Sequence, residues 1–251
     1  LLQLSAMIEE LKQAGIFTFD TETDSLQSVE AELVGMSFSI KEKGGWFLPL
    51  QSRGLFSEEF PEPSASISMI KPLLENSDLK KIGQNIKYDL IVLKNAGINL
   101  KGIFFDTMIA SYLINPSERR HNMDDLAEKH LNYKTITFKE LVGTGKNAIS
   151  ITDVPMDKLA EYAIEDADIT MRLYNIFAPI LKEKGLEKLF NEIELPMIEV
   201  LAEMEISGVK VDTPHFDSMK KNTLTMLSDI EKNIYREAGQ EFNINSTKEL
   251  S

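Results

Sequence analysis

Two carboxylates, Asp20 and Glu22, come at the end of an apolar, strand-like run that begins at Ile16. Residues two apart in a strand point to the same face, so both carboxylates project together from one rigid edge. Hard divalent cations such as Mg²⁺ take oxygen ligands. Two such ions about 3.5–4 Å apart can activate water and stabilise the leaving oxygen of a phosphodiester. Alone, an Asp-x-Glu pair is more often solvated surface charge, but together with further carboxylates it points to metal-dependent phosphodiester hydrolysis.

Two later segments supply further oxygen ligands. Asp89 follows Tyr88, and Tyr162 and Asp166 lie four residues apart in a strongly helical stretch, on one helix face. Taken alone, each of these acids is more typical of solvated surface charge, a helix cap or an ordinary helix face. Their order, and the apolar strand that leads into the first pair, favour a single shared site.

The composition restricts the class of protein and of metal site. The chain has 251 residues, enough for one large or two small domains. It has no cysteine, which excludes disulfides and thiolate metal sites and is compatible with a reducing cytosol. Its three histidines, His121, His130 and His215, are too scattered to indicate a zinc site. No apolar run approaches the roughly 18 residues that a membrane-spanning helix needs.

The charge balance is an objection to a nucleic-acid partner. Forty acidic and 27 basic residues give a net charge of −13, whereas duplex binding usually needs a basic surface. A carboxylate metal site is acidic by its nature, however, and bound cations reverse its local charge. A short single-stranded end can also be held by stacking and a few polar contacts. We therefore expect weak DNA binding by this chain alone.

The apolar patterning predicts an α/β fold with a mixed sheet. Strands are expected at 16–20, 33–40, 46–50, 81–83 and 103–105, with an antiparallel hairpin around the turn 41–45. Helices are expected at 1–15, 67–76, 85–96, 107–112 and 156–181, with Asp106 as an N-cap. Residues 51–66 are expected to form a loop, and 115–155 short helices and loops.

The composition changes around residue 183. Residues 182–185 predict a helix stop and a hinge, and long helices are expected at 186–206 and 214–238 with a strand-like break at 207–212. Ser246 and Glu249 form a capping-box pattern, which predicts the start of another helix. Because the chain lacks an initiator Met and stops shortly after this pattern, we expect it to be a fragment of a longer protein.

The motifs, read together, resemble a known superfamily. Residues 19–23 (Phe-Asp-Thr-Glu-Thr) resemble the first motif of the DEDD 3′→5′ exonucleases, 83–89 the second, and 162–168 the third in its tyrosine form. The histidine form would place His at position 161, which is Glu here. Segments 120–127 and 134–138 are similar to the proofreading domain of bacterial family A polymerases (DNA polymerase I). Segments 194–197, 208–212 and 242–246 resemble the opening of the polymerase domain in that family.

This resemblance implies an RNase H-like exonuclease fold for residues 1–182. For 183–251 it implies a linker and the mostly helical, truncated start of a polymerase domain. It also implies two divalent ions, Mg²⁺ or Mn²⁺. Asp20, Glu22 and Asp166 would hold the first ion, and Asp20 would bridge to a second that Asp89 holds largely through water. Tyr162 would orient the attacking water, and Glu22 would also meet the terminal 3′-hydroxyl.

The resemblance further implies a set of DNA contacts. Leu26 and Phe138 would wedge and stack near the last bases. The residues that would line the strand are Thr23, Gln84, Asn85, Tyr88 and Arg120. On residue type alone, Leu26 and Phe138 favour the core, Asn85 could be a helix N-cap, and Arg120 could belong to a solvated charge cluster at 118–120. Asp168 lies about 200° around the helix from Asp166, so we do not expect it to be a ligand.

The implied function is removal of nucleotides from DNA 3′ ends, as proofreading within a polymerase for replication and repair. The partners would be a single-stranded 3′ end and the rest of the polymerase in cis, at the nucleoid in a bacterial cytoplasm. Two alternatives remain. An exoribonuclease of the same superfamily would share all four carboxylates, but would continue into small helical RNA-binding domains. A scaffold without catalytic activity would only support a polymerase and would bind no metal. The chain ends before any polymerase metal site.

Overall fold

The computed structural model describes residues 2–51 and 62–250, which belong to two compact units, 1–207 and 208–251. The first unit is built on a five-stranded sheet in the order β3-β2-β1-β4-β5. The strands are β1 (Ile16–Thr23), β2 (Leu33–Lys41), β3 (Gly44–Pro49), β4 (Lys80–Gly83) and β5 (Ile103–Asp106). β1 is antiparallel to β2, and β2 to β3, whereas β4 is parallel to both β1 and β5. The predicted mixed α/β fold is therefore confirmed.

One face of the sheet is covered by α1 (Leu2–Ala14), α2 (Pro63–Leu74) and α3 (Ile86–Asn95). Phe17, Phe19 and Phe38 are fully buried against these helices. α2 begins four residues earlier than the sequence predicts, because Pro63 suits the first turn of a helix. Most of the loop expected at 51–66 lies outside the described residues.

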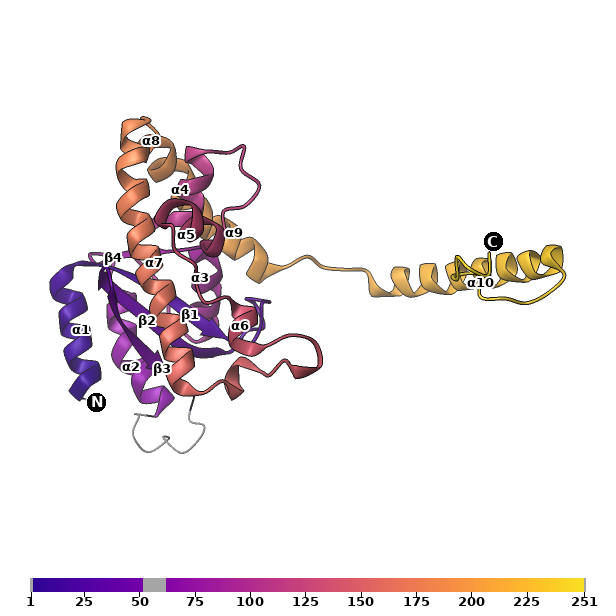
Figure 1. The fold of residues 1–251 in the computed structure, drawn as a ribbon, viewed down its shortest axis with the longest axis horizontal. Coiled ribbons are helices and arrows are strands. Elements are labelled where there is room, and N and C mark those ends of the chain that lie inside the picture. Colours follow the sequence, from indigo (N-terminus) through magenta and orange to yellow (C-terminus); the bar gives the residue numbers. More distant parts are fainter. Residues whose placement is uncertain (1, 52–61, 251) are drawn as a thin grey trace. The chain divides into compact units, whose positions relative to one another are not determined.

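The opposite face carries the long helix α7 (Met156–Glu183), with α4 (Thr107–Ile114) and α5 (Met123–Leu131) beside it (Figure 1). Ala163 and Ala167 are completely buried on α7, and their small side chains allow the helix to lie close to the sheet. The Thr18 hydroxyl donates to the Ala167 carbonyl at 2.8 Å, which ties α7 to β1. Asp166 directly precedes Ala167, and Asp20 lies two residues after Thr18, so this tie brings the two acids near each other.

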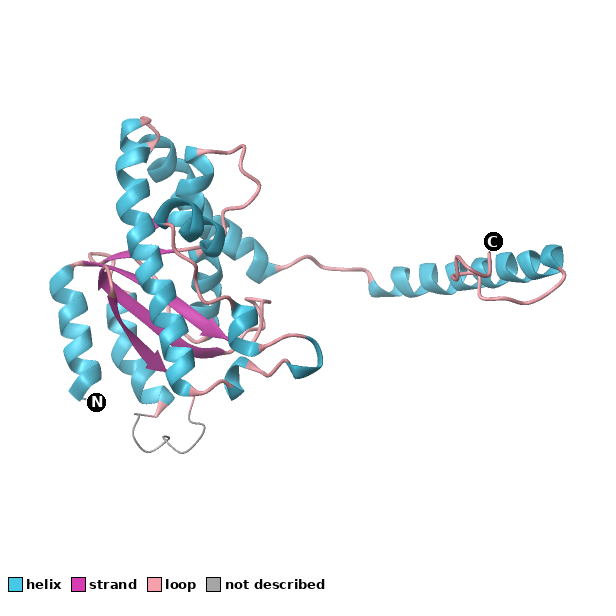
Figure 2. Cartoon of the chain, viewed as in Figure 1, coloured by secondary structure: helices cyan, strands magenta, loops and turns pink. Residues whose placement is uncertain are grey.

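Short elements close one end of the sheet, as the sequence predicts for 115–155. They are α6 (Phe138–Val142) and the 3-10 turns η1 (Gly145–Asn147) and η2 (Ile151–Asp153) (Figure 2). Val142, Ile151 and Leu159 pack together in a small apolar cluster beside the sheet. This cluster anchors the segment between α5 and α7, on which Phe138 lies.

The helix stop after α7 is confirmed, with Gly185 in the left-handed region at φ +67°. The chain then continues as α8 (Glu187–Leu189), the π-helical turn η3 (Phe190–Glu194) and α9 (Leu195–Ser207). α9 packs against α3 through the buried Ile198 and Ala202. It therefore belongs to the first compact unit.

The second unit contains α10 (Thr213–Ala238), which begins at the N-cap Asp212. The break that the sequence predicts between the two long helices is confirmed at 208–212, although none of these residues forms a strand. One prediction near the end of this unit is wrong. The expected helix after Ser246 is only a turn, in which Glu249 accepts from Asn243 N instead of capping Ser246. Forming the first turn of a helix is unfavourable, and a capping pattern alone does not offset that free energy when no further helical turns follow. Across the described residues, no helix is long and apolar enough to cross a membrane.

Candidate metal centre

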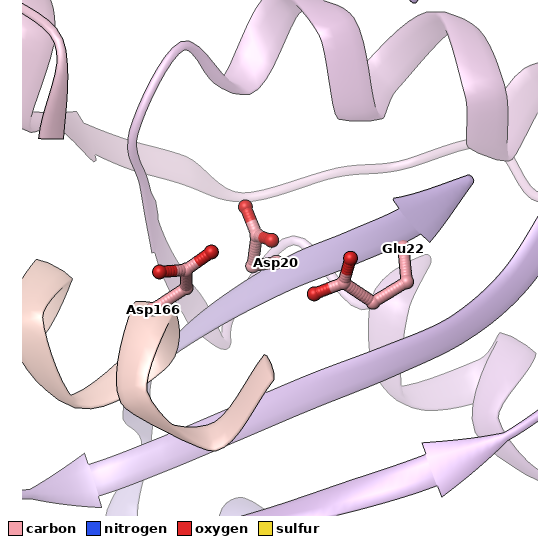
Figure 3. A group of neighbouring side chains, drawn as sticks. All are labelled: Asp20, Glu22 and Asp166. Atoms are coloured by element: carbon pink, nitrogen blue, oxygen red, sulfur yellow. The ribbon is translucent and has the colours of Figure 1, made fainter. Parts of the chain in front are cut away.

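Three carboxylates converge where α7 crosses β1. Asp20, Glu22 and Asp166 each offer an oxygen, and these oxygens lie within 4.8 Å of one another. Figure 3 shows Asp20 and Glu22 rising from the same strand toward Asp166 on the helix. β1 runs to Thr23, beyond its predicted end, so both acids lie inside the strand, opposite Ser37 and Gly35 of β2. Strand alternation therefore gives the two acids the common face that the sequence predicts.

Asp89 approaches from α3, on the other side of the sheet. β4 pairs with β1 only at residues 16–18, so the edge of β1 is open beyond that point. Thr21 uses this open edge: its backbone N–H and its hydroxyl both donate to Asp89 Oδ1, at 3.1 and 2.6 Å. Asp89 lies outside the triad, but its charge is close enough to raise the pKa of Glu22.

Burial and mutual repulsion strongly disfavour the charged forms of these acids. Burial raises the pKa of Asp20 from 3.8 to about 7. Burial, and then the neighbouring carboxylates, raise the pKa values of Glu22, Asp89 and Asp166 well above their ordinary values. Glu22 Oε1 is buried without a hydrogen-bond partner. An unpartnered oxygen among converging carboxylates fits a divalent cation, which would neutralise the repulsion and use the free oxygen.

Tyr162 lies one helical turn before Asp166, and its hydroxyl partly offsets the rise in the pKa of that carboxyl. Burial, followed by the charges of Asp166, Glu22 and Asp20, raises the pKa of Tyr162 above its ordinary value of 10.0. The hydroxyl therefore stays protonated, and it can donate one hydrogen bond while accepting another.

A cavity of about 560 Å³ opens above the acids. It is lined by all four carboxylates, Tyr162 and most of the residues predicted to contact DNA, namely Thr23, Leu26, Gln84, Asn85, Tyr88 and Phe138. Leu26 is 92% exposed and Phe138 45% exposed, so neither is a core residue, although residue type alone favours that reading. No Lys or Arg from the described residues lines this cavity.

Arg120 is not brought to the cavity with the others. Its side chain is 75% exposed and lies 3.7 Å from an oxygen of Asp125, a separation at which an exposed ion pair contributes little. Arg120 is thus an exposed side chain that does not line the cavity, and its predicted contact with DNA stays a prediction.

Internal hydrogen bonds fix several of the lining residues. The Tyr88 hydroxyl bonds to Thr23 and to the Ser25 carbonyl, which holds the loop carrying Leu26. The Gln84 amide donates to the His121 carbonyl at 2.8 Å and accepts from Thr107. Gln84 therefore also ties the 115–122 segment to the cavity rim.

Asn85 occupies the N-cap position of α3 in a left-handed conformation, with φ of +60°. It makes no side-chain capping bond, and Asp106 Oδ2 accepts from Ile86 N instead, at 2.8 Å. Its amide therefore remains available to the cavity. Asp106 also caps α4 by accepting from Ile109 N, as the sequence predicts.

Sequence reasoning missed Thr21 and Asp124. Strand alternation points Thr21 away from its two acidic neighbours, and only the open edge of β1 gives it a role. Asp124 lines the cavity and accepts from the Thr135 hydroxyl at 2.6 Å. Its place in the segment 120–127, which resembles the proofreading domain, was the one available signal. Asp168 lies outside the site, as predicted, and pairs with Arg172 at 2.5 Å.

A family model described as 3′-5′ exonuclease matches residues 2–182. The chain belongs to this exonuclease family. DNA polymerase I of Pseudomonas aeruginosa is 36% identical over 248 residues, which are 98% of this chain and 27% of that protein. DNA polymerase I of Borreliella burgdorferi is 39% identical over 249 residues, 99% of this chain and 26% of that protein. The chain thus spans about a quarter of the length of these relatives.

Solved structures of lower sequence identity share the fold of this chain. The POL domain of Pol1 from M. smegmatis, in complex with DNA primer-template and dNTP, has a TM-score of 0.71 at 20% identity, over 97% of this chain and 38% of that chain. Brucella melitensis NrnC with bound Mg²⁺ has a TM-score of 0.59 at 21% identity, over 78% of this chain and 87% of that chain. At these identities the likeness shows the fold alone. The chain's 3′-5′ exonuclease domain is a hydrolase by family, and its acidic triad suits a divalent metal.

Proposed function

We propose that this exonuclease removes nucleotides from the 3′ end of DNA with two divalent ions, Mg²⁺ or Mn²⁺, as the proofreading part of a DNA polymerase I. The observation that carries this proposal is the convergence of Asp20, Glu22 and Asp166, with Asp89 beside them, at an open cavity. Such a pair of ions, when bound, would activate water and stabilise the leaving oxygen of the phosphodiester.

Each acid has a distinct role in this proposal. Asp20, Glu22 and Asp166 would hold one ion, and Asp89, together with Asp20, would hold the other. The two bonds from Thr21 hold Asp89 in place. Tyr162, whose hydroxyl stays protonated at neutral pH, would form a hydrogen bond with the attacking water and so orient it. Glu22 would also accept a hydrogen bond from the terminal 3′-hydroxyl, and its unpartnered Oε1 supports this role.

The walls of the cavity support recognition of a frayed strand end. Leu26 and Phe138 present exposed apolar surface next to the acids, and a base can stack on an aromatic ring for about 1–3 kcal/mol. Thr23, Gln84, Asn85 and Tyr88 supply polar groups along the same cavity. Arg120 remains in the proposal only as an outer contact to the DNA backbone. Its weak pairing with Asp125 leaves the guanidinium available to a phosphate.

We assign residues 1–182 to the exonuclease domain, and 183–251 to a linker and the first part of a polymerase domain. Exposed apolar side chains on α9 and α10, such as Met204, Met219 and Leu227, support a further partner in cis. A polymerase that serves replication and repair would act at the nucleoid, in the cytoplasm of a bacterial cell.

The test compares 3′-labelled single-stranded DNA with RNA of the same sequence, with Mg²⁺, with Mn²⁺ and with EDTA. We expect release of the 3′-terminal nucleotide from DNA in either metal and none in EDTA. Faster release from RNA would favour the exoribonuclease alternative. Absence of both cleavage and metal binding would favour the scaffold.

A further inference from the structure

Glu165 directly precedes Asp166 on α7, but its side chain binds a neighbouring loop instead of joining the acidic triad. Its Oε1 accepts from the Tyr133 hydroxyl at 2.7 Å, and its Oε2 accepts from the Ile136 backbone N–H at 2.6 Å. Both carboxylate oxygens are thus used by residues 133–137, which we call the α6 entry loop. Hydrogen bonds to a carboxylate are short and stronger than bonds between neutral groups.

The α6 entry loop leads straight to Phe138. Thr137 and Glu140 cap α6 reciprocally: Glu140 N donates to Thr137 Oγ1, and Thr137 N donates to Glu140 Oε2 at 2.9 Å. Phe138 is the first residue of that helix, so only Thr137 separates it from the backbone amide that Glu165 holds. The loop is also tied to Asp124 on the cavity wall, through the Thr135 hydroxyl at 2.6 Å.

The same face of α7 holds the loop at a second point. Arg172 lies 5.4 Å from the centre of the Tyr133 ring, a cation–π contact, and is itself paired with Asp168 at 2.5 Å. Glu165, Asp168 and Arg172 follow one another at spacings of three and four residues, which places them on one side of the helix. One helix therefore fixes both Asp166 and the loop that carries Phe138.

We propose that Glu165 is a positioning residue that sets Phe138 at a fixed place relative to Asp166. The exonuclease then holds a ready stacking wall for the 3′-terminal nucleotide. This inference rests on the proposed function, since it gives Phe138 a nucleotide to stack against. In this proposal Glu165 touches neither the bound DNA nor a metal ion. It acts only by holding the α6 entry loop in place.

The experiment uses Glu165→Ala, Tyr133→Phe and Phe138→Ala, with Glu161→Ala as the matched control, because Glu161 is an exposed acid on the same helix. Binding of a fluorescent single-stranded DNA is measured by anisotropy in EDTA, which separates binding from cleavage. Initial rates with Mg²⁺ are measured on that DNA and on methyl p-nitrophenyl phosphate, a phosphate diester that carries no base to stack on Phe138.

For Glu165→Ala we expect DNA binding to weaken about tenfold, the effect of losing bonds to a charged acceptor. The ratio of the DNA rate to the ester rate should fall by a similar factor. Tyr133→Phe, which loses one bond and keeps the charge at position 165, should show about a threefold effect. Glu161→Ala should change neither. In Phe138→Ala protein, adding Glu165→Ala should cause little further loss of DNA binding, because residues that act through one another are not additive.

Three results would overturn the proposal. Equal losses on DNA and on the ester would mean a general structural effect, and fully additive losses with Phe138→Ala would mean independent action. Unchanged DNA binding in both Glu165→Ala and Tyr133→Phe would remove the role altogether. If Glu165→Ala fails to fold, Tyr133→Phe and its combination with Phe138→Ala decide the matter. Preference of the wild-type protein for RNA would defeat the proposed function, whereas the same cycle on RNA would still test the link to Phe138.

Discussion

Thr21 holds Asp89 with two hydrogen bonds to a single oxygen, from its backbone N–H at 3.1 Å and its hydroxyl at 2.6 Å. This link joins α3 to the strand that carries Asp20 and Glu22, and it crosses the sheet where β4 no longer covers the edge of β1. Asp89 is thereby placed beside the triad without a direct bond to any of its acids among the described residues.

Replacing Thr21 with Val should therefore weaken the binding of one metal ion more than the other. The substitution keeps the shape of the side chain and removes the hydroxyl, and losing such a supporting bond typically costs 10–100-fold in metal affinity. Calorimetric titration with Mn²⁺ measures both affinities. Thr225→Val on α10 is the control, since that hydroxyl bonds only to its own helix. Two unchanged binding steps in the Thr21 variant would contradict this role.

The protein without metal should lose stability as the pH rises. Burial raises the pKa of Asp20 from 3.8 to about 7, so the fold favours the protonated form. The associated stability is fully present below about pH 4 and is lost as the pH rises through 7. In EDTA, the melting temperature should fall by several degrees from pH 5 to pH 8. Mg²⁺ should restore it more at pH 8 than at pH 5, because deprotonated acids bind the ion.

Asp20→Asn is the control for this pH dependence. It keeps the size of the side chain and removes its titration, so the fall in melting temperature in EDTA should be smaller than in the wild type. An identical fall in the two proteins would assign the effect to the general net charge of the chain instead of this centre.

Tyr162→Phe should slow cleavage by roughly 10–10³-fold, the range expected for a group that only orients water. DNA binding in EDTA should hardly change, because the ring and its packing remain. Asp166→Ala should lose more activity than this, as it removes a metal ligand. A loss in Tyr162→Phe as deep as that in Asp166→Ala would require a further role for the hydroxyl.

Hydrogen exchange should distinguish α9 from α10. Ile198 and Ala202 of α9 are buried against α3, and Lys87–Glu205 and Lys94–Glu203 pair across the two helices. α10 has no buried residue. Amides of α9 should therefore be protected nearly as well as those of α7, whereas amides of α10 exchange much faster. Equal protection of α10 would indicate self-association through its exposed apolar residues.

The sequence predicts each half of the acidic site well because the spacing within each half is local. Two acids two apart in a strand share a face, and Tyr162 and Asp166 share a helix face, so spacing alone orients them. The meeting of β1 with α7, in contrast, joins residues distant in sequence and is expected only from the motif order and the resemblance. The bonds of Thr21 to Asp89 and of Glu165 to Ile136 join residues distant in sequence, and no periodicity reports them. The capping pattern at Ser246 is a local signal, but it does not predict the structure correctly. A cap stabilises a helix only when several helical turns follow it.

The most direct test of the whole account is the rate of removal of the last nucleotide from three primers that differ only at the 3′ terminus. Melting three or four paired steps, at about 1.4 kcal/mol each, costs more than stacking one base on Phe138 recovers. We expect the unpaired end to be cut fastest, the mismatched end next and the matched end slowest, with Asp20→Ala inactive on all three. Equal rates on the three ends would contradict proofreading, and a near-native rate in Asp20→Ala would contradict the metal centre itself.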